Sequence, residues 1–212
     1  MFVLGHLGIG SAIGRPLVRP AELRWLCFGA LLPDLIDKPL YYALAFATGR
    51  RAAELGLISG SRTFGHTALF ALLVLLLVRG RRGAALAVGM ATHLLVDLAG
   101  DVYAWLSSDV LHLIASRAPA HPGPGTIGAV LFPLLGPHFP ISPFQTVGEH
   151  VLSVASAWLV FGELAGAALL FWQFRRGDLE PLSLSSASGS AARPSNPAGS
   201  PSRPPPAAPR QG

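Results

Sequence analysis

His93 and Asp97 place an imidazole and a carboxylate four residues apart in the apolar sequence His-Leu-Leu-Val-Asp. Residues at i and i+4 share one face of a helix. Asp34 and Asp37 are three residues apart in LPDLID and share a face if a helix continues past Pro33, which would bend it. Neutral imidazoles and ionised carboxylates are ligands for zinc and other divalent first-row ions. Either pair alone is also typical of a hydrogen-bonded structural pair.

Apolar segments must position these residues. Five segments can enter a bilayer, and they cover residues 2–13, 22–36, 64–78, 84–98 and 151–174. Only the last reaches the about 20 residues that a helix needs to cross the hydrocarbon core. The first is short and glycine-rich, which predicts a half-span. Glu163 lies in the middle of the last segment, where we interpret it as a helix-packing contact.

The connecting regions differ from these segments in composition. Residues 38–63 predict an interfacial helix, because Tyr41 and Tyr42 suit the headgroup level and charged residues stop a span. Residues 100–150 are rich in Gly and Pro and predict a loop with a re-entrant or interfacial piece at 127–135. After Pro181 the sequence is rich in Ser, Pro, Ala and Gly, which predicts a disordered tail.

Composition supports a membrane protein. Of 212 residues, 51% are hydrophobic and only 13% are charged, with a mean hydropathy of +0.49, whereas an ordinary soluble domain carries about 25% charged residues. We therefore predict an all-α, multi-pass transmembrane bundle of four to five spanning or half-spanning helices. The predicted domains are a membrane-embedded helical domain at 1–178 and a disordered tail at 179–212.

The basic character of the chain has a membrane explanation. Its net charge is +5 and its pI is near 10.3, but the arginines sit at the ends of apolar segments rather than in a stripe with aromatics, which argues against a nucleic-acid partner. The single cysteine, Cys27, excludes an intrachain disulfide and any cysteine-based zinc site.

Basic residues near span ends favour the cytoplasm. If all five segments cross, eight basic residues lie on one side and five on the other. This bias predicts a multi-pass protein with its N-terminus outside and its C-terminal tail in the cytoplasm.

The alternating topology brings ionisable residues from four segments to the outer face. They are His6, Asp34, Asp37, His66, His93 and Asp97. Ionisable residues inside apolar spans cost about 2.5–3.5 kcal/mol each on insertion scales, and function is their default explanation. All six are ligand types at one depth, which predicts a divalent metal site with zinc as the favoured ion.

An N-terminal His followed by LLPDLID, RTFGHT and GMATHLLVD resembles the predicted membrane-bound metal-dependent hydrolases of the bacterial inner membrane, some of them under LexA control. The resemblance covers roughly residues 1–175. It implies metal-binding roles for the same six residues, and Arg62 matches the family's arginine. Ser61 stands where the pattern has its first His, and Gly65 and Thr67 replace Thr and Ser.

Together these features predict a hydrolase of the inner membrane that acts on an ester or phosphoester. The depth of the site points to a lipid or lipid-linked substrate at the outer interface. Asp37 is a candidate general base, and Arg62 either neutralises a phosphate or carboxylate or anchors its span. Two alternatives are a non-enzymatic protein that binds or transports a divalent cation, and a structural protein whose His and Asp residues hydrogen-bond between helices.

Overall fold

Long apolar stretches with few breakers favour helices, and a computed structural model describes the result for residues 3–50, 52–112, 125–136, 139 and 157–179. Every regular element in this part of the chain is helical, which confirms the all-α prediction. The longer helices are α1 (Val3–Gly14), α2 (Leu23–Thr48), α3 (Ala68–Leu77), α4 (Arg81–His112) and α7 (Ala157–Arg175).

Short elements connect these helices. They are the 3-10 turns η1 (Arg15–Leu17), η2 (Pro20–Glu22), η3 (Ala52–Leu55) and η4 (Phe64–His66), and the short helix α5 (Gly125–Val130). All of them fall in one unit, residues 1–182, and a second unit, residues 183–212, lies outside the described part. The predicted tail therefore also lies outside it, apart from Leu179.

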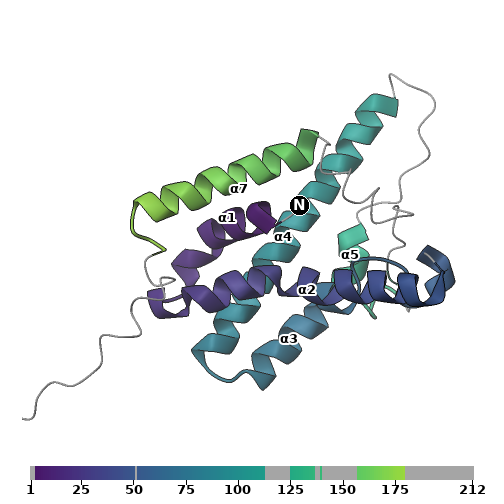
Figure 1. Cartoon of the computed structure of the whole chain (residues 1–212), viewed down its shortest axis with the longest axis horizontal. Helices are drawn as coiled ribbons and strands as arrows, with labels where there is room; N and C mark the ends of the chain where they lie inside the picture. The colour runs from purple at the N-terminus through teal and green to yellow at the C-terminus, as the bar shows by residue number, and fades with distance from the viewer. Residues whose placement is uncertain (1–2, 51, 113–124, 137–138, 140–156, 180–212) are drawn as a thin grey trace, which may run out of the picture. The chain divides into compact units, whose positions relative to one another are not determined.

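Helices α2 and α4 pack most extensively on each other, and glycines permit their close approach (Figure 1). A Cβ on Gly29 would lie 2.3 Å from the carbonyl oxygen of Leu86, and one on Gly89 would lie 2.2 Å from that of Leu26. The two backbones thus touch where any side chain would push them apart. Because this crossing lies one to two turns before Asp34 and Asp37 on α2, it fixes the position of these two residues along α4.

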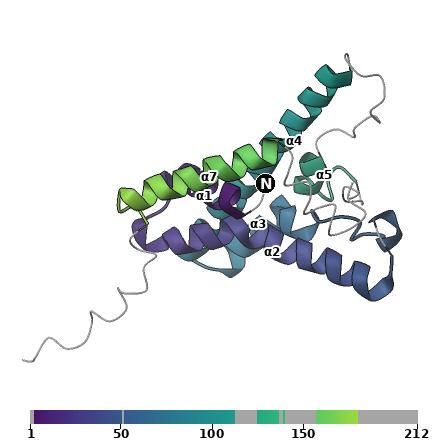
Figure 2. The same ribbon diagram turned by 45° about the horizontal axis from the view of Figure 1, so that its top comes forward.

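Helix α1 packs against α2, α4 and α7, and α7 runs alongside it in both Figure 1 and Figure 2. Gly8 and Gly166 form the contact, since a Cβ on Gly8 would lie 2.0 Å from the Gly166 carbonyl oxygen. The carboxylate of Glu163 accepts hydrogen bonds from the backbone amides of Leu4 and Gly5 at 3.0 and 3.1 Å. A side chain of α7 thus caps the first turn of α1, whose amides have no partner within the helix.

Helix α2 differs from the sequence prediction. Residues 38–48 continue α2 as one helix instead of beginning a separate interfacial helix. Pro33 and Pro39 each remove one backbone donor, but the packing of α2 on α4 and on η4 holds the helix together across both prolines. The helix ends at Gly49, whose φ of 68° is the left-handed conformation that glycine adopts most readily.

Helix α4 is also longer than predicted. It runs for 32 residues through the start of the region interpreted as a loop. Asp101, one turn after Asp97, forms an ion pair with Arg62 that anchors this extension. The predicted re-entrant piece at 127–135 overlaps α5 and the turn after it. Helix α7 begins at Ala157, and the first residues of the predicted last span lie outside the described part.

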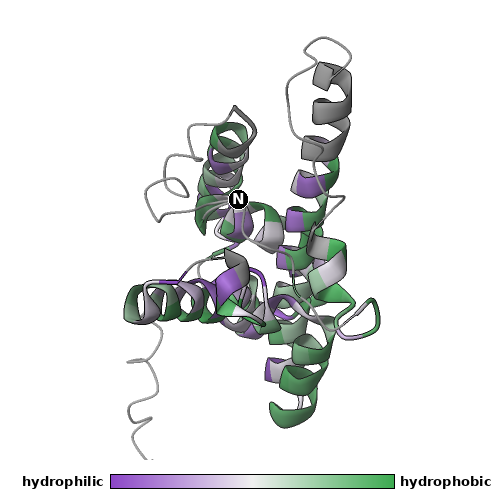
Figure 3. Cartoon of the chain, turned by 90° about the vertical axis from the view of Figure 1, so that its right-hand side faces the viewer, coloured by the Kyte–Doolittle hydropathy of each residue, from purple (hydrophilic) through white to green (hydrophobic). Residues whose placement is uncertain are grey.

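One described helical stretch, Arg81–Tyr103 of α4, is long and apolar enough to cross a membrane. The third predicted span becomes η4 followed by the ten-residue α3, which extends only about 15 Å at 1.5 Å per residue. The leucines of α3 are exposed, with Leu76 and Leu77 at 63% and 72%. Figure 3 shows hydrophobic residues along most of the described helices.

Candidate metal centre

Asp37 of α2 holds the loop that carries His66. Its Oδ2 accepts hydrogen bonds from the amides of Thr63 and His66 at 2.6 and 3.2 Å, and its Oδ1 accepts one from the Gly65 amide at 2.9 Å. Oδ2 also lies 2.7 Å from His66 Nδ1. A Cβ on Gly65 would lie 2.8 Å from the carbonyl oxygen of Pro33, so a glycine lets η4 sit directly on α2. Asp37 is fully buried and committed to this loop.

His66 and His93 face each other through Nε2, at 3.2 Å. Because a carboxylate only accepts, His66 Nδ1 donates to Asp37 and its Nε2 carries a lone pair when the ring is neutral. His93 Nδ1 donates to the carbonyl oxygen of Ala30 at 2.7 Å, which leaves its Nε2 in the same state. Two lone pairs at this distance repel each other unless a proton or a metal ion lies between them. Metal-binding histidines are typically fixed by such a hydrogen bond at the other ring nitrogen.

Two carboxylates complete the group. Asp97 Oδ2 lies 3.6 Å from His66 Nε2 and 3.7 Å from His93 Nε2. Asp34 Oδ1 lies 3.7 and 4.0 Å from the same two nitrogens. Four donor atoms from α2, η4 and α4 thus surround one point. Tetrahedral zinc with bonds of about 2.0–2.1 Å separates two nitrogens by about 3.3–3.4 Å, close to the 3.2 Å found here.

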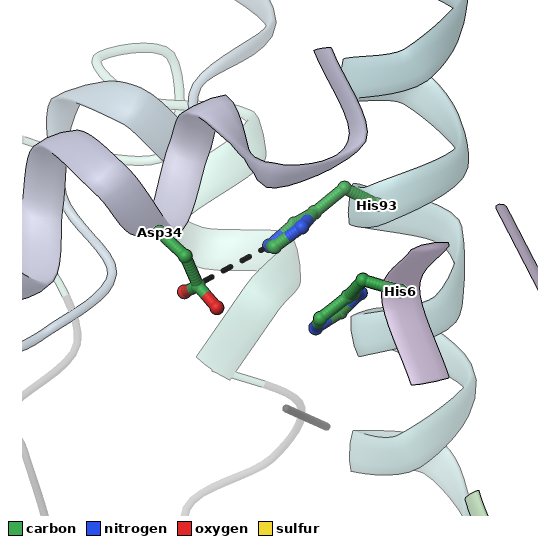
Figure 4. A group of neighbouring side chains, drawn as sticks. All are labelled: His6, Asp34 and His93. Carbon is green, nitrogen blue, oxygen red and sulfur yellow. Dashed lines mark ion pairs between the residues drawn. The ribbon is translucent and has the colours of Figure 1, made fainter. Parts of the chain in front are cut away.

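His6 reaches the same point from α1, as Figure 4 shows together with Asp34 and His93. Its ring stacks on that of His93 with 3.8 Å between centroids and 15° between planes. Its Nε2 lies 3.4 Å from Asp97 Oδ1. The ring is 1% exposed, and neither of its nitrogens has a hydrogen bond with any described residue.

Two permanent cations border the group. Lys38 Nζ lies 2.5 Å from Asp34 Oδ2, one turn along α2. Arg62 connects two carboxylates of α4, with Nε 3.1 Å from Asp97 Oδ2 and Nη1 2.8 Å from Asp101 Oδ1. Burial alone would lower the pKa of the Arg62 guanidinium, but Asp97 and Asp101 outweigh it and raise that pKa above its usual value. Arg62 therefore remains charged at any pH the protein tolerates.

The side chains around this group carry more negative than positive charge. Four carboxylates, of Asp34, Asp37, Asp97 and Asp101, lie in it or beside it, together with the cations of Lys38 and Arg62. With neutral histidines the net charge is −2, which one divalent cation balances. Buried charge without compensation is costly, so the arrangement favours a bound cation.

The structure brings five of the six predicted ligands together from four elements, as two groups of three that share His93. They are His6, Asp34, His66, His93 and Asp97. The sixth, Asp37, lies behind His66 with its oxygens occupied. Ser61 lies half-buried in the bend before η4.

Sequence reasoning missed three features around the group. Lys38 and Asp101 each follow a predicted ligand by four residues, a spacing that could have identified them. Glu163 is the third. It packs α7 on α1, as its interpretation as a packing contact implies, but its capping of the helix that carries His6 had no sequence signal.

Comparison with known proteins gives a match over the part of the chain that contains the candidate ligands. Residues 1–102 match the model of a family described as YdjM inner membrane protein. The matched range contains all six predicted ligands and Arg62, and it supports the expectation of a bacterial inner-membrane protein. The family description gives a location and no reaction. No curated protein matches the chain, and no solved structure does.

Proposed function

We propose that this protein is a multi-pass, membrane-bound hydrolase that uses a divalent metal ion, with zinc favoured, on an ester or phosphoester. The proposal combines the donor group with the inner-membrane similarity and with the resemblance to predicted metal-dependent hydrolases. Its single most important support is the pair of histidines whose Nε2 atoms face each other at 3.2 Å while both Nδ1 atoms are committed.

The proposed ligands are His66, His93, Asp34 and Asp97. Each histidine is fixed through Nδ1, and each carboxylate has one oxygen in the group and a cation beside it. A divalent ion bound there would supply Lewis-acid chemistry toward water and an ester or phosphoester oxygen. This chain's own residues hold the ligands in place before any substrate arrives.

Asp37 and Arg62 take positioning roles in this proposal. A general base must reach the proton that it abstracts, but both oxygens of Asp37 face backbone amides and His66. Arg62 was interpreted as a group that neutralises a phosphate or carboxylate or anchors its span, and in this proposal its guanidinium fixes Asp97 against Asp101. Carboxylates and cations in such positions orient ligands and tune their basicity.

His6 is the proposed proton carrier. Unlike His66 and His93, it has no hydrogen bond from a described residue that would fix one ring nitrogen. It lies beside the donor atoms, stacked on His93 and close to Asp97. A buried imidazole with both nitrogens available can take a proton from one side and release it on the other.

The sequence predicts a site at headgroup depth, but the structure places Asp34 in the middle of α2, and His93 and Asp97 in the middle of α4 and within its apolar stretch 81–103. The group thus lies ten or more residues along these helices from the arginines near their starts, which the positive-inside rule assigns to the cytoplasm. We therefore keep a lipid or lipid-linked substrate, reached from the extracytoplasmic side, as the proposed substrate class.

Metal content tests the first step. The full chain, purified in detergent, is analysed by elemental mass spectrometry beside a His93→Ala/Asp97→Ala variant and a Thr92→Val control. Thr92 is buried next to His93, but its hydroxyl donates to the Gly89 carbonyl within α4. We expect about one ion per chain in wild type and control and a loss in the double variant. Equal, negligible metal in all three would refute the proposal.

Hydrolysis tests the second step. Wild type, the double variant and the control are assayed on a nitrophenyl phosphodiester and on phospholipid vesicles, with and without chelator. Chelator-sensitive hydrolysis by wild type and control is the expected result. Metal binding without hydrolysis, together with cation uptake into liposomes, would identify the cation carrier in place of the enzyme.

A further inference from the structure

A cavity lies at the C-terminal end of α1, whereas His6 of the candidate metal centre lies near the start of that helix. It has a volume of about 510 Å³ and is bounded by the end of α1, the turns η1 and η2, the start of α2 and the end of α7. Arg15 follows His6 by nine residues, or about 14 Å along a helix, so the cavity is separate from the donor group. Volumes of about 300–1,000 Å³ are typical of small-molecule sites.

The charged groups of this cavity are basic. Arg15 and Arg19 line it, and Trp172 forms another part of its wall. Asp178 pairs with Arg15 at 2.6 Å, which leaves a net positive charge. Arg176 stacks on Trp172 at 3.9 Å from the ring centroid and adds a cation close to the cavity. An indole beside arginines at the end of apolar helices is typical of the headgroup level.

Gln173 supplies an acceptor. Its side chain is 1% exposed and lines the cavity, with Nε2 donating to Ser11 Oγ at 3.1 Å. Its Oε1 has no hydrogen bond with any described residue. A buried carbonyl without a donor costs about 1–3 kcal/mol. The cavity therefore offers guanidinium groups to an anion, and a buried carbonyl without a donor belongs to one of the residues that line it.

We propose that this cavity binds the headgroup of an anionic phospholipid of the phosphatidylglycerol class. The phosphodiester pairs with Arg15 and Arg19, and a headgroup hydroxyl donates to Gln173 Oε1. Basic pockets between membrane helices at the cytoplasmic side commonly bind anionic headgroups. The arginine-rich end of this chain is the end that the positive-inside rule places there. The proposal does not depend on metal binding or hydrolysis at the other end.

Lipid binding to the full chain in detergent, followed by native mass spectrometry, tests the arginines. The probes are dioleoyl-phosphatidylglycerol and dioleoyl-phosphatidylcholine, offered to wild type, Arg15→Gln/Arg19→Gln and the control Arg24→Gln/Arg82→Gln. Arg24 and Arg82 belong to the same basic end but stack on Trp25 outside the cavity. We expect wild type to prefer phosphatidylglycerol and the cavity variant to lose about 25-fold, about five-fold for each arginine.

The control decides between a site and a diffuse basic surface. An equal loss in both double variants, or none in the cavity variant, overturns the proposal. If the cavity variant fails to fold, as judged by its thermal unfolding, Arg19→Gln alone replaces it, because Arg19 is exposed and an about five-fold loss is expected.

Two further probes separate the ligand sources. Dioleoyl-phosphatidylmethanol carries the same phosphodiester without headgroup hydroxyls, so wild type should bind it more weakly than phosphatidylglycerol. Gln173→Met should remove that preference, and a preference that survives refutes the role of Gln173. Millimolar inorganic phosphate should not displace the lipid. Displacement would identify free phosphate as the ligand and overturn the lipid proposal.

Discussion

Asp37→Asn tests whether the carboxylate behind His66 organises the proposed metal centre. The substitution keeps the size of the side chain but replaces an anionic acceptor by an amide that accepts at one atom and donates at the other. In the better of the two orientations of the amide, its carbonyl oxygen still accepts hydrogen bonds from the backbone amides of Thr63 and His66 and from Nδ1 of His66. The new NH₂ then faces the Gly65 amide, so two donors meet at the place of a 2.9 Å hydrogen bond.

The expected loss follows from these contacts. One charge-assisted hydrogen bond, worth about 1.5–3 kcal/mol, disappears, and the others fall toward the about 0.5–1.5 kcal/mol of neutral bonds. Burying an amide costs less than burying a carboxylate, which offsets part of the loss. We expect a net destabilisation of about 3 kcal/mol, or a fall in Tm of about 6–12 °C for a domain of this size.

The assay is thermal unfolding of the metal-free protein, combined with metal competition against a chelator of known affinity. Loss of an outer partner of a ligating histidine typically weakens metal binding by about 10–100-fold. Asp178→Asn is the control, because Asp178 pairs with the half-exposed Arg15 far from the centre. Exposed pairs contribute about 0–1 kcal/mol. An Asp37→Asn variant that melts with the wild type and binds metal equally well would refute this reasoning.

Three other substitutions give separate readouts. His6→Phe retains the stacking ring and should keep the metal while hydrolysis falls about 100-fold or more; parallel loss of metal would make His6 a ligand instead. Arg62→Gln removes the guanidinium that pairs with the buried carboxylate of Asp97. It should lower the free energy of unfolding by about 2 kcal/mol in chelator and by less when metal is bound. An equal decrease with and without metal would contradict the charge argument. Gly8→Ala pushes a methyl group into the Gly166 carbonyl and should destabilise by about 1–3 kcal/mol. Gly10→Ala, whose nearest contact is a side-chain oxygen at 3.0 Å and not a backbone atom, is its control, and equal thermal unfolding of the two variants would refute the close contact.

The sequence was informative where chemistry follows helical spacing. His93 and Asp97 lie one turn apart on α4 and both reach the donor group, as their i and i+4 positions predict. Asp34 and Asp37 show the limit of such reasoning, because they lie only three residues apart on α2 and yet have different partners. Asp34 faces the group, whereas Asp37 binds a loop almost thirty residues later. That loop folds back through non-local contacts, which local periodicity does not encode.

Helix boundaries were predicted less well, for a related reason. Prolines in α2 and polar residues after Gly100 in α4 are ordinary signs of helix ends. In the folded chain, packing of α2 on α4 and the ion pair between Arg62 and Asp101 outweigh these local preferences. The cap that Glu163 places on α1 is more distant still, because it joins positions 158 and 159 residues apart.

This cap joins a helix inside the range that matches the family model to a helix outside it. The matched residues 1–102 contain every candidate ligand, while the side chain that secures the helix of His6 comes from α7, outside that range. Relatives could therefore exchange the last helix without altering the ligands, provided that the replacement presents a carboxylate and a small residue to α1. For protein engineering, two co-expressed fragments divided between α5 and α7 would have to reassemble through the contacts of α1 with α7 before His6 is held in place. The Glu163 cap, the Gly8–Gly166 contact and the hydrogen bond from Gln173 to Ser11 are among these contacts.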